Sequence, residues 1–317
     1  MLKTAIILLC VLALDGLLPK ISRWRPLFWL EKYTATLVRY LQPSLTLNAP
    51  RRHVLRGLFA LILQFFPILP MALLYYAQPD QTGILDLVLL YIVFDYVHPR
   101  RQLRILHNHL IQGQLAKAKE YIRPWLKRDP SQMSAPELAR TTLESYAISQ
   151  FRNIFGLLFW FIFFGGLGAW VYWLSMQFDR QCAKNGKSLT YFRAPAQWVC
   201  DFADWLPARI FAVTVLISSR PRHTWRCWRT QAWQWHTPAE HLVLAITGGR
   251  LGLMLGGPTL EYGLSVPRPY LGLGDPVTAR DLRRVEGLIN QCLWRWVLTD
   301  MFLAWVIYQP FNLDAPD

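Results

Sequence analysis

The sequence predicts an all-α, polytopic helical membrane protein with about five or six membrane segments, one of them a candidate re-entrant hairpin, plus cytoplasmic helices. Three observations predict this class. Of the 317 residues, 53% are hydrophobic, which exceeds the roughly 45–50% of an ordinary soluble domain. The apolar residues gather in runs long enough to form membrane helices. Lys and Arg residues lie between these runs, as they do in the cytoplasmic loops of membrane proteins.

The apolar runs give the predicted membrane segments in order. They are Leu2–Leu18, Gly57–Ala77, Gly83–Val97, Ile154–Met176, Ala208–Ser218 and Leu293–Tyr308. We expect Pro67 and Pro70 to kink the second segment, because proline removes a helical hydrogen bond. The fifth segment is short, and an amphipathic stretch that starts near Ala194 extends it backwards.

The distribution of charge orients these segments in a bacterial inner membrane. The loop between the first two segments carries eight basic residues against the single acid Glu31, and is therefore predicted to be cytoplasmic. The turn at 78–82 carries Asp80 and no base, which predicts a periplasmic position. Two cytoplasmic helical segments follow, at 98–152 and 219–290.

The run Ile154–Met176 allows two interpretations. A single straight span is the simpler one. The alternative is a re-entrant hairpin that breaks at the glycines Gly165, Gly166 and Gly168, and it is slightly favoured because both flanks are basic. Non-helical backbone at membrane depth must be buried in protein or line a wet cavity.

Charge and cysteine usage exclude other classes of protein. The net charge of +14 could also indicate a nucleic-acid binder, but the basic residues alternate with membrane segments, so no nucleic-acid partner is expected. The block 220–235 interleaves Arg with Trp, which favours a segment at the surface of anionic lipid. The five cysteines are scattered singly, with neither a disulfide framework nor a zinc-binding spacing.

Several motifs resemble a known superfamily in order and spacing. They are Leu143–Ser145, Leu158–Trp160, Gly165–Gly166, Asp204–Arg209 and Leu251–Pro258. Together they are similar to the CbiB/CobD membrane proteins of cobalamin biosynthesis, and they predict a single domain of this type over residues 1–317. The resemblance implies an ATP-dependent ligase that attaches an aminopropanol unit to a cobyric acid carboxylate by an amide bond. Such chemistry uses a nucleotide held by Mg²⁺, which prefers clustered carboxylates.

This chain departs from the family pattern where those carboxylates are expected. The family's Glu-Asn-x-x-Asp is replaced by Ile148-Ser149-Gln150-Phe151-Arg152, and its paired Asp-Asp by Cys200-Asp201. An Arg in place of an acid repels Mg²⁺. We therefore expect the ligase activity to be lost and no cofactor to be bound, with Mg²⁺ and ATP required only if the ligase alternative holds.

A second resemblance leads to the main functional prediction. Phe151-Arg152 before Leu158–Trp160, and the stretch His107–Leu110, look like the AmpE branch of the same superfamily. That branch implies a regulatory or signalling protein linked to β-lactamase induction and cell-wall stress. Its implied partners are the lipid bilayer and other membrane or cell-wall recycling proteins. The alternatives are an adenosylcobinamide-phosphate synthase and a structural partner of another membrane protein.

The candidate site is a residual polar pocket with no assigned catalytic residue and no metal. Its predicted members are Glu144, Arg152, Asp179, Asp201, Asp204 and Arg209. Ionisable groups near membrane depth are functional candidates by default, although helix capping and ion pairing would explain the same residues. Gly256, Gly257 and Pro258 form a candidate backbone loop that either cradles phosphate or makes a turn.

Overall fold

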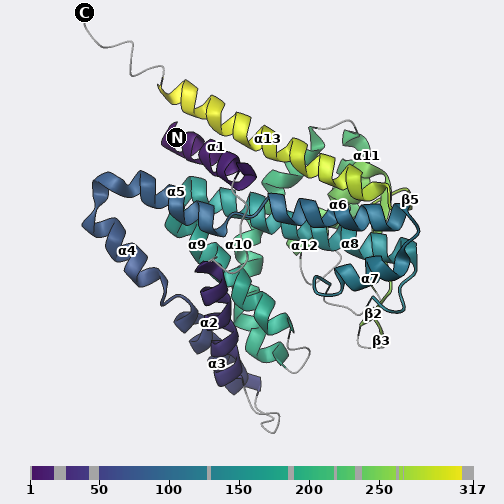
Figure 1. The fold of residues 1–317 in the computed structure, drawn as a ribbon, viewed down its shortest axis with the longest axis horizontal. Helices are drawn as coiled ribbons and strands as arrows, with labels where there is room; N and C mark the ends of the chain where they lie inside the picture. The colour runs from purple at the N-terminus through teal and green to yellow at the C-terminus, as the bar shows by residue number, and fades with distance from the viewer. Residues whose placement is uncertain are drawn as a thin grey trace, which may run out of the picture. The chain divides into compact units, whose positions relative to one another are not determined.

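The computed structural model describes residues 2–17, 26–42, 50–126, 130–184, 189–217, 220–232, 238–261, 264–266 and 268–308. The predicted all-α class is confirmed, since helices carry most of these residues (Figure 1). The helices are α1 (Leu2–Leu17), α2 (Pro26–Leu41), α3 (Pro50–Gln64), α4 (Ile68–Ala77), α5 (Thr82–Val93), α6 (Val97–Ile111), α7 (Leu115–Ile122), α8 (Ala135–Gln150), α9 (Leu157–Lys184), α10 (Thr190–Leu216), α11 (Pro221–Gln231), α12 (Pro238–Leu251) and α13 (Asp281–Tyr308). A short 3₁₀ turn spans Pro79–Gln81, and a π-helical segment spans Phe151–Gly156.

The chain forms two compact units, and it passes between them four times. Unit 1 comprises Met1–Phe94, Gly156–Ala203 and Val297–Asp317. Unit 2 comprises Asp95–Phe155 and Asp204–Trp296. The first crossing coincides with a break between α5 and α6, where Phe94 adopts an extended backbone. The second lies in the π-helical segment.

Unit 1 is built around α9, which α1–α5 and the first part of α10 accompany. Its core is a cluster of buried side chains from α2, α3, α9 and α10, together with the residue that precedes α10. They are Val38, Ala60, Leu61, Phe178, Cys182, Leu189, Phe192 and Ala196. The predicted kink at Pro67 is confirmed, because α3 ends at Gln64 and α4 begins at Ile68. Pro70 lies within α4 and does not interrupt it.

The chain reverses direction at Gly165, inside α9. Gly165 has φ 63° and ψ −159°, a backbone conformation outside the helical region that favours glycine. A β-carbon on Gly156 would overlap the hydroxyl of Tyr172, although 16 residues of straight helix would separate the two by about 24 Å. A β-carbon on Gly168 would likewise lie 2.7 Å from the carbonyl oxygen of Trp160. Of the two sequence interpretations, the structure shows the hairpin and not the straight helix.

Asp86 of α5 holds the tip of this hairpin. Its Oδ1 atom accepts a hydrogen bond of 2.7 Å from the backbone N–H of Gly166 and another from the Tyr75 hydroxyl. The ammonium group of Lys3 lies 3.8 Å from the other carboxylate oxygen. The carboxylate thereby satisfies a backbone donor at the start of the returning helix, where negative charge is favoured.

Three helical stretches are long and apolar enough to cross a membrane by length and composition. Within the described residues they are Arg51–Ala77, Thr82–Ile111 and Ala135–Lys184. The predicted last segment falls within α13, and the predicted fifth segment lies in α10 as far as Leu216, where that helix ends, while Ser218 lies outside the described residues. Both helices begin earlier than these segments, and α10 begins at Thr190, close to the predicted Ala194. One face of α10 exposes large apolar side chains, among them Trp198, Phe202, Trp205, Ile210 and Val213. Such a face is suited to contact with lipid.

Unit 2 contains α6–α8, α11, α12, the parts of α10 and α13 that fall in its range, and short strands that the sequence analysis did not predict. The strands are β1 (Leu253–Gly256), β2 (Thr259–Glu261), β3 (Leu264–Val266), β4 (Tyr270–Leu271) and β5 (Asp275–Pro276). β1 lies between β4, to which it is antiparallel, and β5, to which it is parallel; β2 and β3 form an antiparallel pair. An aromatic cluster fills part of the interior, with ring centroids of Phe155 lying 4.5 Å from Phe211 and 5.3 Å from Trp296.

Candidate functional site

Arg152 is the centre of a buried ion-pair group in unit 2. Its Nε donates to Oδ2 of Asp204 at 2.8 Å, and its Nη1 lies 2.9 Å from Oε1 of Glu240. The side chain of Arg152 is 9% exposed and that of Asp204 is fully buried. The group links three segments, since Arg152 lies in the π-helical segment, Asp204 in α10 and Glu240 in α12. π-Helical turns are rare and occur frequently at functional sites.

This group has two carboxylates for one guanidinium, so its formal charge is −1 when all three side chains are ionised. A buried charge is tolerated when it is paired and hydrogen-bonded. Arg152 is therefore a fixed cation balanced by acids on two neighbouring helices, and it holds those helices against the π-helical segment.

Glu144 joins α8 to the glycine-rich loop. Its Oε1 accepts a 2.7 Å hydrogen bond from the backbone N–H of Gly256, and its Oε2 lies 3.5 Å from Nη1 of Arg268. Gly256 has φ 71°, and the backbone N–H of Gly257 donates to the carbonyl of Pro269 at 3.0 Å. Both glycine N–H groups are thus used within the protein, which is the arrangement of a turn.

The remaining predicted site residues are Asp179, Asp201 and Arg209. Asp179 and Asp201 belong to unit 1, where Asp179 Oδ1 pairs with Nε of Arg193 at 2.6 Å. Arg209 lies over the Trp205 ring, 3.8 Å from its centroid, and donates to the Trp205 carbonyl at 2.7 Å. The structure pairs Arg152 with Asp204, and Glu144 with the backbone of Gly256. That all six predicted residues line one pocket stays a prediction.

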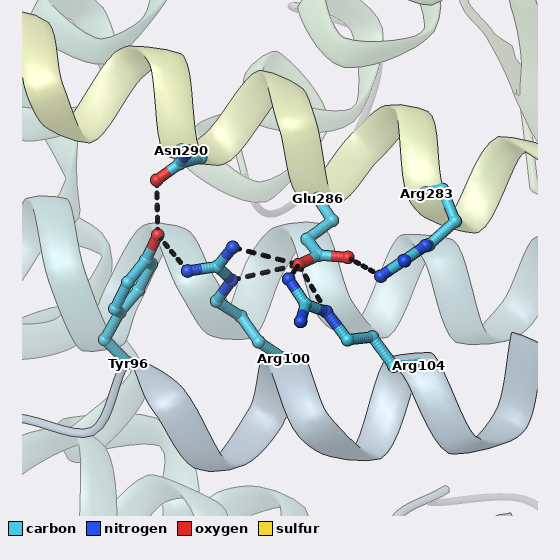
Figure 2. Close-up of polar contacts among 6 residues, drawn as sticks. All are labelled: Tyr96, Arg100, Arg104, Arg283, Glu286 and Asn290. Atoms are coloured by element: carbon cyan, nitrogen blue, oxygen red, sulfur yellow. Dashed lines mark hydrogen bonds and ion pairs between the residues drawn. The ribbon is translucent and has the colours of Figure 1, made fainter. Parts of the chain in front are cut away.

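A second polar network joins α6 to α13 in unit 2 (Figure 2). Oε1 of Glu286 accepts hydrogen bonds from Arg100 Nε at 3.1 Å and from Arg104 Nη2 at 2.6 Å. Its other oxygen, Oε2, accepts one from Arg283 at 2.9 Å. Tyr96 extends the network, since its hydroxyl donates to Asn290 and accepts from Arg100 at 2.6 Å.

The environment of Glu286 favours its ionised form. Its side chain is only 5% exposed, and this burial by itself raises the pKa of the carboxyl. Hydrogen bonds and positive charge from Arg104 and Arg100 outweigh the burial and hold the pKa below the ordinary glutamate value. Three guanidinium groups against one carboxylate leave a formal surplus of two positive charges on this face of α6 and α13.

The sequence analysis did not identify Glu240 and Glu286 as site residues. Glu240 lies 88 positions after its partner Arg152, and Glu286 lies 182 positions after its partner Arg104. The one available signal for Glu286 is its spacing of three from Arg283, which places both side chains on one face of a helix. That spacing does not reveal the partners on α6.

The carboxylates of the described residues do not form a site for a divalent metal. Among the described residues, no three His, Cys, Asp or Glu side chains lie close enough together to hold a metal ion. The candidate acids are instead paired with guanidinium groups: Asp204 and Glu240 with Arg152, Glu144 with Arg268, Asp179 with Arg193. The residues that the structure describes therefore do not fit a carboxylate-held Mg²⁺ centre, and no chemical step is assigned to one.

These features define a helical membrane protein with a buried polar site in which arginine side chains neutralise the carboxylates. No solved structure matches the chain, so structural similarity does not narrow this class further.

The chain belongs to the CobD/Cbib protein family, whose sequence profile matches residues 8–289. It is 30% identical to the cobalamin biosynthesis protein CobD of Chromobacterium violaceum over 306 residues, which cover 96% of this chain and 98% of the relative. It is also 30% identical to the protein of the same name from Stutzerimonas stutzeri over 302 residues, covering 93% and 96% of the two chains. The Mycobacterium tuberculosis protein of that name is 32% identical over 186 residues, 57% of this chain and 59% of the relative.

The predicted AmpE-type role in β-lactamase induction and signalling is wrong. Relatives that match nearly the whole chain are named for cobalamin biosynthesis, which supports the alternative instead. The prediction depended on Arg152 as a repulsive cation in a former metal site. The structure shows that two carboxylates balance this cation, so its presence does not by itself indicate an abandoned site.

Proposed function

We propose that this protein acts in cobalamin biosynthesis as an adenosylcobinamide-phosphate synthase, which forms an amide bond at the expense of ATP. The observation that carries the proposal is the similarity to proteins named CobD along almost the entire chain. The family resemblance implies the reaction: the carboxylate of a cobyric acid and the amine of an aminopropanol unit are joined.

The charges of unit 2 support such a reaction. A carboxylate becomes reactive toward an amine when ATP transfers a phosphoryl group to it, and the amine then displaces phosphate from the acyl carbon. Negative charge develops in both steps, and preorganised cations stabilise it. Unit 2 provides such cations in the Glu286 network, where Arg100 and Arg104 are held in place by hydrogen bonds to Glu286 and the formal charge is positive.

We assign Arg152, Asp204 and Glu240 to positioning, because they fix the π-helical segment against α10 and α12. Since the described carboxylates do not gather around a metal position, we propose that Mg²⁺ enters with ATP as part of the substrate. Mg²⁺ is commonly held by substrate phosphates and only one or two protein carboxylates.

The membrane remains the proposed partner of this chain. Three helical stretches are apolar and long enough to span it, and basic residues flank them. We propose the inner membrane of a bacterium as its location, with several passes and with the basic segments facing the cytoplasm, where ATP is available.

Complementation tests this function directly. The gene is expressed in a bacterial mutant that lacks its own CobD protein and is grown where cobalamin synthesis limits growth. We expect growth with this gene and none with the empty vector. Isolated membranes supplied with a cobyric acid, an aminopropanol substrate and MgATP should form the amide, detected by mass spectrometry, with one ADP released per product. Failure of both assays, with the protein shown to be inserted in the membrane, would overturn the proposal.

A further inference from the structure

Four arginines of unit 2 form a second cationic cluster, which shares no residue with the Glu286 network. They are Arg220, just before α11, Arg250, in the last turn of α12, and Arg284 and Arg295, both in α13. Two direct observations place the first three around the C-terminal end of α12. Arg284 Nη2 donates to the carbonyl of Leu251 at 2.6 Å, and Arg220 Nη1 lies 2.5 Å from where a β-carbon on Gly252 would be.

The Nε atom of Arg250 is buried and has no hydrogen-bond partner among the described residues. Burial, and next the charges of Arg220, Arg295 and Arg284, lower the pKa of the Arg250 guanidinium below the ordinary arginine value. A cation that is partly desolvated and surrounded by like charge is unfavourable unless an anion compensates it.

The carboxylate of Asp281 is bound to Arg284 of this cluster and to Thr278. Asp281 pairs with Arg284 through Oδ1 at 2.6 Å, and its Oδ2 accepts hydrogen bonds from Thr278. Burial alone raises the pKa of the Asp281 carboxyl, but these bonds and Arg284 lower it overall, so the group is anionic. Among the described residues, this one carboxylate stands against Arg220, Arg250 and Arg284, which leaves these three arginines with a formal surplus of two positive charges.

Helix capping explains part of this arrangement. Cations are favoured at the C-terminus of a helix, and the bond from Arg284 to Leu251 satisfies one terminal carbonyl of α12. Capping explains neither the unbonded, buried Nε of Arg250 nor the approach of further guanidinium groups to it. Convergent guanidinium groups with unused donors are instead the typical recognition element for phosphoryl oxygens.

We propose that Arg220, Arg250 and Arg284 form a binding site for a phosphoryl oxyanion, with Arg295 adding to the local positive potential. The assignment of a phosphate-bearing substrate to this site rests on the proposed function. The binding of an oxyanion does not, because a binding experiment measures it without any enzymatic reaction. The oxyanion could belong to a soluble phosphate compound or to a phospholipid headgroup. The chemistry is the same, and the experiment separates the two sources.

The test measures thermal unfolding of the full chain in neutral detergent with inorganic phosphate or with chloride at matched ionic strength. We expect phosphate to raise the unfolding midpoint more than chloride does. Arg250→Gln and Arg220→Gln should each weaken phosphate binding by about tenfold or more, since each removes a charged donor. Arg220 is exposed, so we expect Arg220→Gln to fold normally. This variant therefore tests the site even if Arg250→Gln does not fold. Arg229→Gln, an exposed arginine on α11 outside the cluster, is the matched control and should bind phosphate as the wild type does.

A second arm replaces inorganic phosphate with nanodiscs that contain phosphatidylglycerol, compared with nanodiscs of phosphatidylcholine. Stabilisation by phosphate that both variants lose would identify a soluble ligand. Stabilisation by phosphatidylglycerol alone, lost in the same variants, would identify a lipid headgroup. The site would be disproved if neither anion stabilised the wild type, or if both variants responded as the control does. Because this experiment measures binding and not turnover, failed complementation would not overturn the anion site. Failure to bind phosphate or lipid would likewise not overturn the proposed enzymatic function.

Discussion

The guanidinium of Arg152 forms a hydrogen-bonded ion pair with Asp204, which lies 52 residues further along the chain and is fully buried. The position that departs from the family's acidic motif is therefore not an isolated cation. It binds an acid on α10 and, through Nη1, a second acid on α12.

Removal of this guanidinium should destabilise the protein strongly. Arg152→Met leaves Asp204 and Glu240 without their cation, and loss of one partner of a buried pair costs about 3–5 kcal/mol. Thermal unfolding in detergent should show a much lower midpoint, while Arg222→Gln on the exposed face of α11 should leave it almost unchanged. The double variant Arg152→Met/Asp204→Leu should recover part of the loss. A wild-type midpoint for Arg152→Met would show that the pair does not stabilise the fold.

Glu286 should make stability depend on acid pH. Its pKa is lowered in the folded state, so its contribution is fully present above the ordinary glutamate value of about 4.3 and disappears as pH falls through the lowered folded value. Glu286→Gln lacks this contribution. The difference in unfolding midpoint between wild type and variant should therefore be largest near neutral pH and shrink below about pH 4.3. A difference that stays constant across that range would contradict the ionised pairing with Arg100 and Arg104.

Two glycine-to-alanine changes should have opposite signs. Gly165→Ala forces a residue with a β-carbon into φ 63° and brings that carbon to 2.9 Å from Oδ1 of Asp86, so a loss of about 1–2 kcal/mol or more is expected. Gly287 lies within α13 with open space around it, and alanine there should stabilise the helix by about 0.5–1 kcal/mol. A midpoint for Gly165→Ala equal to or above that of the wild type would contradict the hairpin at Gly165.

Glu144 should tolerate glutamine better than alanine. The Glu144→Gln variant keeps a side-chain oxygen that accepts the Gly256 N–H, and it loses only the charge opposite Arg268. Alanine leaves the Gly256 donor without an acceptor, which costs about 1–3 kcal/mol. Unfolding midpoints of Glu144→Gln and Glu144→Ala measure the difference, with Glu120→Ala on the exposed side of α7 as control. Equal losses for glutamine and alanine would assign the effect to charge and not to the backbone hydrogen bond.

Local features of the fold were predictable from the sequence because they follow from local chemistry. Proline cannot continue the helical hydrogen-bond pattern, and α3 does end just before Pro67. Adjacent glycines in an apolar run permit a reversal that other residues resist, and the chain reverses at Gly165. The short strands between Leu253 and Pro276 were missed, since two to four residues carry too little periodicity to be distinguished from loop.

The candidate site was only partly accessible from the sequence. Arg152, Asp204 and Glu144 were singled out as charged residues near apolar runs, but their partners Glu240, Arg268 and the backbone of Gly256 were not paired with them. An ion pair depends on the distance between atoms, and the sequence gives no distance between α8, α10 and α12. The functional error had the same origin, because a substituted cation was evaluated without the acids around it.

The sequence by itself determined that this is a helical membrane protein of the CbiB/CobD superfamily and where several of its helices break. These properties depend on hydropathy, on backbone chemistry and on motif order, all of which are local or additive along the chain. The tertiary structure alone decided which charges neutralise one another. It placed Glu286 between Arg100 and Arg104, 182 to 186 residues away. It also left Arg250 near other arginines, with a buried Nε that donates no hydrogen bond to any residue the structure describes. Such pairings arise when helices pack, because the free energy of a buried charge depends on whichever groups the fold brings within a few ångströms of it.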